Sequence, residues 1–298
     1  MIILLICSLS ISQEVNKNRY SAYLDSIMNH STIISINNKH ETILGRDNDP
    51  KQSSEISKLK LLIRKIIWEI TTMPGLRFLT RLIYPSSTIS YFDVQNAVAF
   101  TIDDGFCGID NNIGCMVNEV RQLFKSYDAH ATFFVVGSHC KYSDINTINL
   151  LIEDGNEIAN HNMMDWPYDN YSLEEFEYDL ELTKNILSIY NQKYSKWYRA
   201  PFGKYSFSMQ KVIEKKNLIH VIPDVFAHDT YIPDPYWISE HILRKVKPGS
   251  IILIHMPERG IREWNYKAIE LTLKGLQEKK LKVLNLTELE ALENINFH

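Results

Sequence analysis

The sequence predicts an α/β fold, a single distorted (β/α) barrel with parallel strands. From Ala97 onward, short apolar runs alternate with amphipathic segments of helical length, which is the pattern of strand–helix units with parallel strands. A chain of 298 residues is long enough for one such domain with a buried core. The predicted strands are Ala97–Thr101, Ala131–Val136, Glu157–Asn160, Lys196–Tyr198, Leu218–Ile222, Ser250–Ile254 and Lys282–Leu286.

The chain begins with an apolar run, Met1 to Ser12, which gives way to polar residues at Gln13. This run has the length of a secretory signal peptide and is too short to span a bilayer. Because basic residues do not precede the apolar run, a short anchor or a mis-assigned start is the alternative. We expect residues 1–13 to be a signal peptide and the protein to be secreted, extracellular or located in a cell wall.

Residues 14–93 are predicted to form a leader ahead of the main domain at 94–292. Up to about Ser57 the leader is polar and shows no sustained period. From Lys58 to Ile70, apolar residues recur at helical spacing with basic residues between them, which predicts an amphipathic helix that ends before Pro74. We expect this helix to pack its apolar stripe on the following domain. Association with a membrane surface is possible and is not favoured.

A second helix is predicted from the capping box at Ser172 to Glu175, and it runs to about Ser188. The polar motifs described below each begin where a predicted strand ends. In parallel α/β barrels the carboxyl ends of the strands carry the active site. We therefore expect these motifs to converge in space although they are far apart in the sequence.

The charge balance is slightly acidic, with 32 basic and 36 acidic residues. A protein without an overall positive field is not drawn to nucleic acid, so we expect no nucleic-acid partner. The 16 tyrosines suit stacking on sugar rings as well as packing in a core.

Removal of the signal peptide leaves three cysteines, Cys107, Cys115 and Cys140. Cys107 and Cys115 bracket a turn-rich loop that a local disulfide could close, as is common in oxidising compartments. We expect this pair, with buried free thiols as the alternative. A zinc cluster is not expected, because paired C-x-x-C spacing is missing.

Asp103 and Asp104 follow the apolar strand that starts at Ala97. Adjacent carboxylates at such a position can divide two tasks, one binding a metal and one accepting a proton. An Asp-Asp-Gly turn without chemistry is the alternative.

His161 and Asp165 are four residues apart. A helical or tightly turned backbone would put both side chains on one face, where they could share a cation with a third ligand. A histidine that only hydrogen-bonds a neighbouring aspartate is the alternative.

Arg199 opens the segment Arg-Ala-Pro-Phe-Gly, and His255 closes the apolar run that starts at Ser250. A guanidinium can hold a carboxylate in a fixed orientation, and amides of such a loop can face a developing oxyanion. His255 is placed as either a general acid or a buried core histidine. For Arg199 the alternative is a structural ion pair.

In order and residue type, these motifs resemble the polysaccharide deacetylases of carbohydrate esterase family four, the NodB-homology or chitin-deacetylase-like domain. The resemblance extends over about Val94 to Leu292. Residues 101–105, Thr-Ile-Asp-Asp-Gly, are similar to the family's Thr-Phe-Asp-Asp-Gly, and residues 199–203 are similar to Arg-x-Pro-(Tyr/Phe)-Gly. Leu253 with His255 resembles the closing Leu-x-His element.

The resemblance implies a role for four catalytic residues. Asp103 would be the catalytic base and Arg199 would orient it. His255 would be the acid, and Asp229 would support that histidine.

The resemblance also implies one divalent metal ion, held by Asp104 and by His161, the first histidine of the family's His-(Ser/Thr)-x-x-His motif. The second histidine of that motif is Asp165 here. A site with one histidine and two carboxylates is richer in oxygen, which favours manganese, iron or cobalt over zinc.

The resemblance further implies two residues of the substrate pocket. The Phe202 amide would help to form the oxyanion hole, and Leu253 would line the substrate pocket. The tryptophan that usually follows the supporting aspartate is Thr230 here, which leaves open the pocket wall that receives the acetyl methyl group.

These observations predict a metal-dependent hydrolase that removes N-acetyl groups from N-acetylglucosamine polymers, with chitin or a chitooligosaccharide as the expected substrate. An amidase or deacetylase for peptidoglycan or a small cyclic amide is one alternative. A non-catalytic carbohydrate-binding relative is the other, because Asp165 departs from the metal motif.

Overall fold

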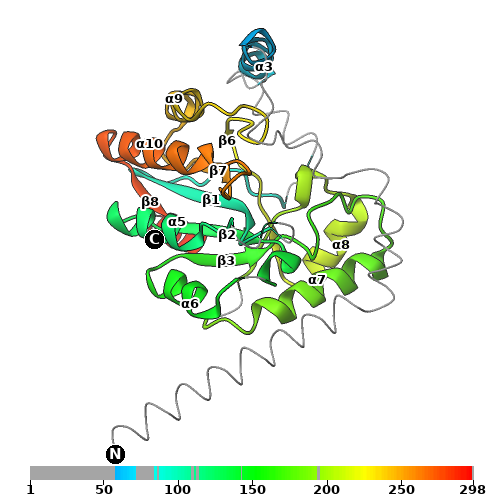
Figure 1. The fold of residues 1–298 in the computed structure, drawn as a ribbon. Coiled ribbons are helices and arrows are strands. Elements are labelled where there is room, and N and C mark those ends of the chain that lie inside the picture. The colour runs from blue at the N-terminus through cyan, green and yellow to red at the C-terminus, as the bar shows by residue number, and fades with distance from the viewer. Residues whose placement is uncertain are drawn as a thin grey trace, which may run out of the picture. The chain divides into compact units, whose positions relative to one another are not determined.

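A computed structural model describes residues 58–71, 84–85, 87–108, 111, 114–141, 143–192 and 195–296. One sheet of parallel strands runs in the order β5-β4-β3-β2-β1-β7-β6, and β8 pairs with β1 (Figure 1). This architecture confirms the predicted distorted α/β barrel. The strands are β1 (Ala97–Gly105), β2 (Ala131–Val135), β3 (Glu157–Asn160), β4 (Trp197–Tyr198), β5 (Ile219–His220), β6 (Val225–Phe226), β7 (Ile251–His255) and β8 (Lys282–Leu284).

Helices connect the strands and flank the sheet (Figure 1). Two short 3₁₀ helices, η3 (Gly137–Cys140) and η4 (Pro201–Gly203), follow β2 and β4. The α-helices are α3 (Lys58–Thr71), α5 (Val117–Ser126), α6 (Ile145–Glu153), α7 (Leu173–Leu187), α8 (Phe207–Lys215), α9 (Pro235–Lys245), α10 (Trp264–Glu278) and α11 (Leu286–Asn296).

Strand β1 is the centre of the sheet, because it pairs with β2, β7 and β8. All nine of its residues are buried, as expected for a parallel strand covered on both faces. Its sequence is apolar up to Ile102 apart from Thr101, whose hydroxyl donates to the Ile252 carbonyl at 2.6 Å. The strand then continues through Asp103 and Asp104, so both carboxylates are carried into the interior of the protein.

The predicted elements agree with the structure within a few residues. β3 has the predicted bounds, whereas β1 extends beyond the predicted Thr101 to Gly105. The capping box is confirmed, because Ser172 Oγ accepts from the Glu175 amide at 3.2 Å and Glu175 Oε2 accepts from the Ser172 amide at 3.0 Å. β6 was not predicted, because a two-residue strand is too short to show a period.

Helix α3 contacts the domain differently from the prediction. The apolar stripe that we expected to pack is 47–66% exposed, at Leu59, Leu62, Ile63, Ile66 and Ile67. The opposite side of the helix makes the contacts instead: Arg64 donates to the Tyr231 carbonyl at 2.8 Å, and Trp68 stacks on His228 at 4.5 Å between ring centroids. Lys65 pairs with Asp234. Ion pairs, hydrogen bonds and the aromatic contacts of Trp68 with Phe226 and His228 therefore attach this helix to the segment around β6 and α9.

Part of the predicted leader lies outside the described residues. This includes the expected signal peptide at 1–13 and the polar segment up to residue 57. Among the helices that the structure does describe, none combines the length and the apolar character needed to cross a bilayer.

Candidate active site

Asp103 and His255 end two neighbouring strands and lie opposite each other in the sheet. Asp103 of β1 is the register partner of His255 of β7. The Met256 amide, one residue later, donates to the Asp103 carbonyl at 2.9 Å. The two groups that the resemblance assigns to proton transfer are therefore brought together at the carboxyl ends of parallel strands.

Arg199 fixes the orientation of Asp103. Its Nη1 donates to Asp103 Oδ1 at 2.6 Å and to Thr101 Oγ1 at 2.8 Å, and its Nε donates to the Val221 carbonyl at 3.1 Å. The guanidinium lies over the Phe134 ring, 4.1 Å from the centroid. Arg199 and Asp103 are 2% and 4% exposed, so this ion pair is buried. Hydrogen bonds to three acceptors fix the position of the guanidinium.

Asp229 holds His255 in a similar way. The carboxylate accepts from His255 Nδ1 at 3.0 Å, from the His255 amide at 2.8 Å and from Asn265 Nδ2 at 2.6 Å. Burial alone would lower the pKa of His255, but the Asp229 carboxylate beside it raises that pKa to about 9. The imidazole is therefore protonated at neutral pH and can serve as a proton donor.

This raised pKa predicts how stability depends on pH. The His255 pKa rises from 6.5 to about 9 on folding, so its contribution to stability is fully present below about pH 6.5 and is lost as pH rises through about 9. We expect the difference in unfolding free energy between the wild type and His255→Ala to shrink over this window in urea titrations. A difference that stays constant from pH 6 to pH 10 would contradict the assigned pKa.

His161 and Asp104 lie next to Asp103. His161 Nδ1 lies 2.7 Å from the Arg199 carbonyl. Because a carbonyl can only accept, Nδ1 is the donor in this hydrogen bond, and the other ring nitrogen, Nε2, faces the carboxylates. His161 Nε2 is 3.7 Å from Asp104 Oδ1 and 3.9 Å from Asp103 Oδ2. Two of the predicted metal ligands are therefore close together.

A guanidinium already neutralises Asp104. Arg262 Nη1 donates to Asp104 Oδ2 at 2.6 Å, and both residues are buried. Burial alone would raise the pKa of Asp104, but the charges of Arg262, His255 and His161 hold it well below its usual range. The positive partner of this carboxylate is thus a residue of the chain itself.

The predicted three-residue metal site is not formed. No group of three or more His, Cys, Asp or Glu side chains that could hold a metal ion occurs in the described part of the chain. The expectation for Asp165 allowed a helical or a tightly turned backbone after His161, and the structure has a turned one, in which Asn162 has a left-handed φ of 62° and residues 163–166 form bends. Among the described residues, Asp104, His161 and Asp165 are therefore not assembled as a three-ligand group, and the role of these three residues as metal ligands stays a prediction.

Phe202 and Leu253 belong to two strand–loop segments that are not adjacent in the sheet, the turn after β4 and the middle of β7. Phe202 belongs to η4, has a φ of 57° and is 57% exposed. Leu253 lies in β7, paired with Thr101 and Phe226, and is 7% exposed. The oxyanion-hole role of the Phe202 amide and the substrate-pocket role of Leu253 stay predictions.

Four residues in the left-handed backbone region surround the site: Asp104, Asn162, Phe202 and Arg262. For residues other than glycine this conformation costs about 1–3 kcal/mol each, and such residues cluster at functional sites. They lie in the segments at or after the ends of β1, β3, β4 and β7. Part of the backbone strain among the described residues thus lies where the polar residues meet.

Three residues of the site did not stand out in the sequence: Arg262, Asn265 and Asp179. Asp179 of α7 accepts from Asn162 Nδ2 at 2.8 Å and from the Met163 amide at 2.9 Å, which holds the turn after His161. A charged residue on the buried face of α7 was the available signal. For Arg262 and Asn265 the only signal was their position shortly after the strand that carries His255.

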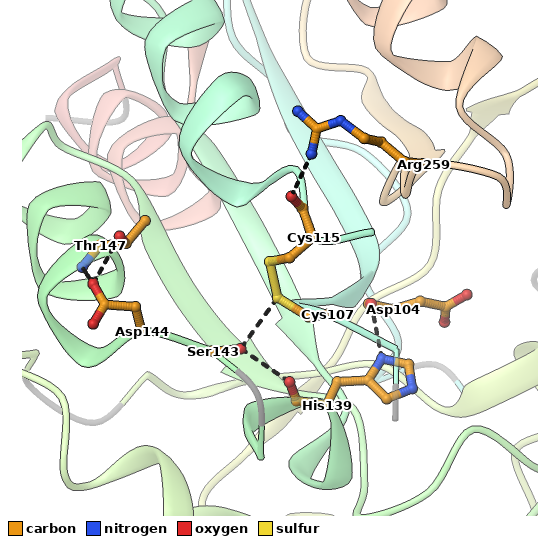
Figure 2. The surroundings of a disulfide bond; sticks show 8 residues. All are labelled: Asp104, Cys107, Cys115, His139, Ser143, Asp144, Thr147 and Arg259. Carbon is orange, nitrogen blue, oxygen red and sulfur yellow. Dashed lines mark hydrogen bonds between the residues drawn. A yellow bond between two sulfur atoms is a disulfide. The ribbon is translucent and has the colours of Figure 1, made fainter. Parts of the chain in front are cut away.

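The loop after β1 is closed by a disulfide between Cys107 and Cys115, as predicted, with 4.9 Å between the Cα atoms. Figure 2 shows how this bond is connected to the site: Cys107 Sγ accepts from Ser143 Oγ, which also donates to the His139 carbonyl at 2.9 Å. His139 Nδ1 in turn donates to the Asp104 carbonyl at 3.0 Å. The disulfide is therefore connected to the Asp104 backbone through hydrogen bonds of Ser143 and His139.

We expect Cys107→Ser to lower the free energy of unfolding by about 2–3 kcal/mol, the loss for a closed loop of this length. Non-reducing peptide mapping of protein from an oxidising secretory host should find Cys107 joined to Cys115. Cys140→Ser, at a buried cysteine outside the disulfide, is the control and should leave the mapped pair unchanged. Recovery of Cys107 and Cys115 as free thiols would contradict the pairing.

Comparison with known proteins agrees with the resemblance. Residues 93–220 match the model of the polysaccharide deacetylase family. A chitooligosaccharide deacetylase of Azorhizobium caulinodans is 29% identical over 163 residues, 54% of this chain and 74% of that protein. The peptidoglycan-N-acetylmuramic acid deacetylase PdaC of Bacillus subtilis is 24% identical over 199 residues, 67% of this chain and 40% of that protein.

Solved structures share the fold. A pseudoenzyme of carbohydrate esterase family four from Bacillus anthracis aligns with a TM-score of 0.58 at 24% identity, covering 68% of each chain. A family 4 acetyl xylan esterase from Clostridium thermocellum, in complex with a cobalt ion, aligns with a TM-score of 0.56 at 25% identity, covering 66% of this chain and 91% of that one.

Proposed function

Because residues 93–220 of this chain carry a polysaccharide deacetylase domain, we propose that the protein hydrolyses N-acetyl groups on polymers of N-acetylglucosamine, with chitin as the substrate class. The observation that carries the proposal is a pair of dyads, the buried Asp103 with Arg199 and the partly buried His255 with Asp229, in which Asp103 and His255 lie on neighbouring strand ends. A carboxylate oriented by a guanidinium suits a proton acceptor, and an imidazole hydrogen-bonded to a carboxylate suits a proton donor.

In this mechanism a water molecule attacks the acetamide carbonyl. Asp103 accepts the proton of that water as the new carbon–oxygen bond forms, while Arg199 keeps the carboxylate aimed at it. The protonated His255 then donates to the amide nitrogen as the carbon–nitrogen bond breaks. The products are acetate and a free amino sugar, and Asp229 compensates the charge of the imidazolium before the transfer.

A second candidate function is carbohydrate binding without hydrolysis. The buried pair of Arg262 with Asp104 favours it, because that carboxylate is engaged by a residue of the chain. Under this alternative the strand-end surface would hold a sugar polymer while releasing no acetate.

Acetate release measured on chitin oligomers and peptidoglycan, together with ring opening measured on a small cyclic amide, tests the proposal. Release from chitin oligomers supports the proposed substrate class, and release only from peptidoglycan moves the substrate to cell-wall glycan. Binding to chitin beads with no acetate from any substrate would establish the binding function instead.

We further propose that the protein is secreted and acts in an extracellular space or a cell wall. The disulfide between Cys107 and Cys115 supports an oxidising compartment, and polymeric substrates of this class lie outside cells. Fractionation of the native host, with the protein found in the medium or the wall, tests this placement.

A further inference from the structure

Arg262 occupies the position of a counter-ion in the candidate active site. Its Nη1 lies 2.6 Å from Asp104 Oδ2, and the two residues are 3% and 4% exposed. We propose that Arg262 is the resident cation of this site, that it takes the role of a divalent metal ion beside Asp104, and that it keeps such an ion out.

The charges balance without a metal ion. Asp103 and Asp104 are adjacent buried carboxylates, and each has its own guanidinium at 2.6 Å, Arg199 and Arg262 respectively. Two negative and two positive charges leave no net charge among these four groups. A divalent cation would add two uncompensated positive charges in a site of low dielectric, where repulsion is strong.

The ligands left for a metal ion are too few. Asp104 Oδ1 and His161 Nε2 are 3.7 Å apart, which is a spacing that two ligands of one ion could have. Catalytic metal sites usually have three protein ligands, and a third is not in place among the described residues. The second oxygen of Asp104 is occupied by Arg262.

The fold holds Arg262 in this position. The preceding turn is closed by paired backbone hydrogen bonds between Glu258 and Ile261. Glu258 also forms a β-bridge with Cys115 of the disulfide, and the Arg259 amide donates to the Gly114 carbonyl at 2.8 Å. Arg262 itself has a left-handed φ of 53°. A buried guanidinium in a strained backbone is retained only where a paired charge compensates its burial.

Cobalt binding to the full-length protein tests the proposal. The wild type, treated with chelator and titrated with Co²⁺, should hold well under one ion per chain by elemental analysis and should show no protein-dependent visible absorption. Arg262→Ala should bind Co²⁺ at least about tenfold more tightly, because the repelling charge beside Asp104 is gone. The additional change Asp104→Ala should abolish that gain.

Two matched variants control the experiment. Arg259→Ala removes an exposed arginine of the same loop that pairs with Glu119, and it should not change cobalt binding. Arg262→Lys keeps the positive charge and should exclude Co²⁺ as the wild type does. Arg262→Gln serves as the neutral variant if Arg262→Ala does not fold.

Two results would overturn the proposal. One is stoichiometric Co²⁺ in the wild type that disappears in Asp104→Asn, and the other is neutral Arg262 variants that fold but bind no more Co²⁺ than the wild type. These results do not depend on the proposed function, because they measure metal content. If the wild type excludes cobalt and releases no acetate from any substrate, only the deacetylase proposal fails.

Discussion

Replacement of Asp103 by Asn should lower the rate of acetate release at least about a hundredfold, the size of effect expected for a general base. The amide has nearly the same shape as the carboxylate but cannot accept a proton from water. His255→Ala should have an effect of the same order, because it removes the group that protonates the leaving amine. Turnover under saturating chitin oligomer, measured together with the thermal unfolding midpoint, separates lost chemistry from lost folding.

The matched control for these two variants is Asp93→Asn, at an exposed aspartate on the segment leading into β1. We expect it to retain wild-type turnover. If either Asp103→Asn or His255→Ala releases acetate at a rate near the wild type, the role assigned to that residue is wrong.

Replacement of Arg199 by Ala should destabilise the fold by about 3–5 kcal/mol, the usual penalty for leaving one partner of a buried ion pair without its counter-ion. Arg199 is 2% exposed and its guanidinium holds Asp103, Thr101 and the Val221 carbonyl, so several buried acceptors lose their donor at once. Urea unfolding of the wild type and the variant at pH 7 measures this effect.

A double-variant cycle identifies the cause of that loss. Arg199→Met combined with Asp103→Leu removes both charges, and it should be more stable than Arg199→Met alone. Arg244→Ala, at a half-exposed arginine that pairs with Glu69, is the surface control and should cost at most about 1 kcal/mol. A double variant no more stable than Arg199→Met would show that packing, rather than charge, accounts for the loss.

The architecture could be predicted because its central strands are apolar runs bounded by helices of clear period. The run from Ala97 marks β1, and the capping box at Ser172 marks the start of α7. The convergence of Asp103 with His255 followed from a topological rule, since the ends of parallel strands share one side of a sheet. These inferences needed only local pattern and strand direction.

The metal ligands could not be predicted in the same way. The relation of His161 to Asp165 depended on the backbone between them, which has a left-handed Asn162 followed by bends and not a helix. Arg262 had no visible motif, because its importance comes only from a contact with Asp104 across 158 residues of sequence. Similarly, the packing of α3 could not be predicted from its apolar stripe, since ion pairs and Trp68 make its contacts.

The position of β1 in the sheet has a consequence for biogenesis. This strand emerges early from the ribosome, but two of its three partners, β7 and β8, begin only at Ile251 and Lys282. Until nearly the whole domain has been synthesised, one edge of this central strand has no partner, and such an edge is a template for aggregation. We therefore expect the folding of this domain to depend on how long this edge stays exposed before the last two strands arrive.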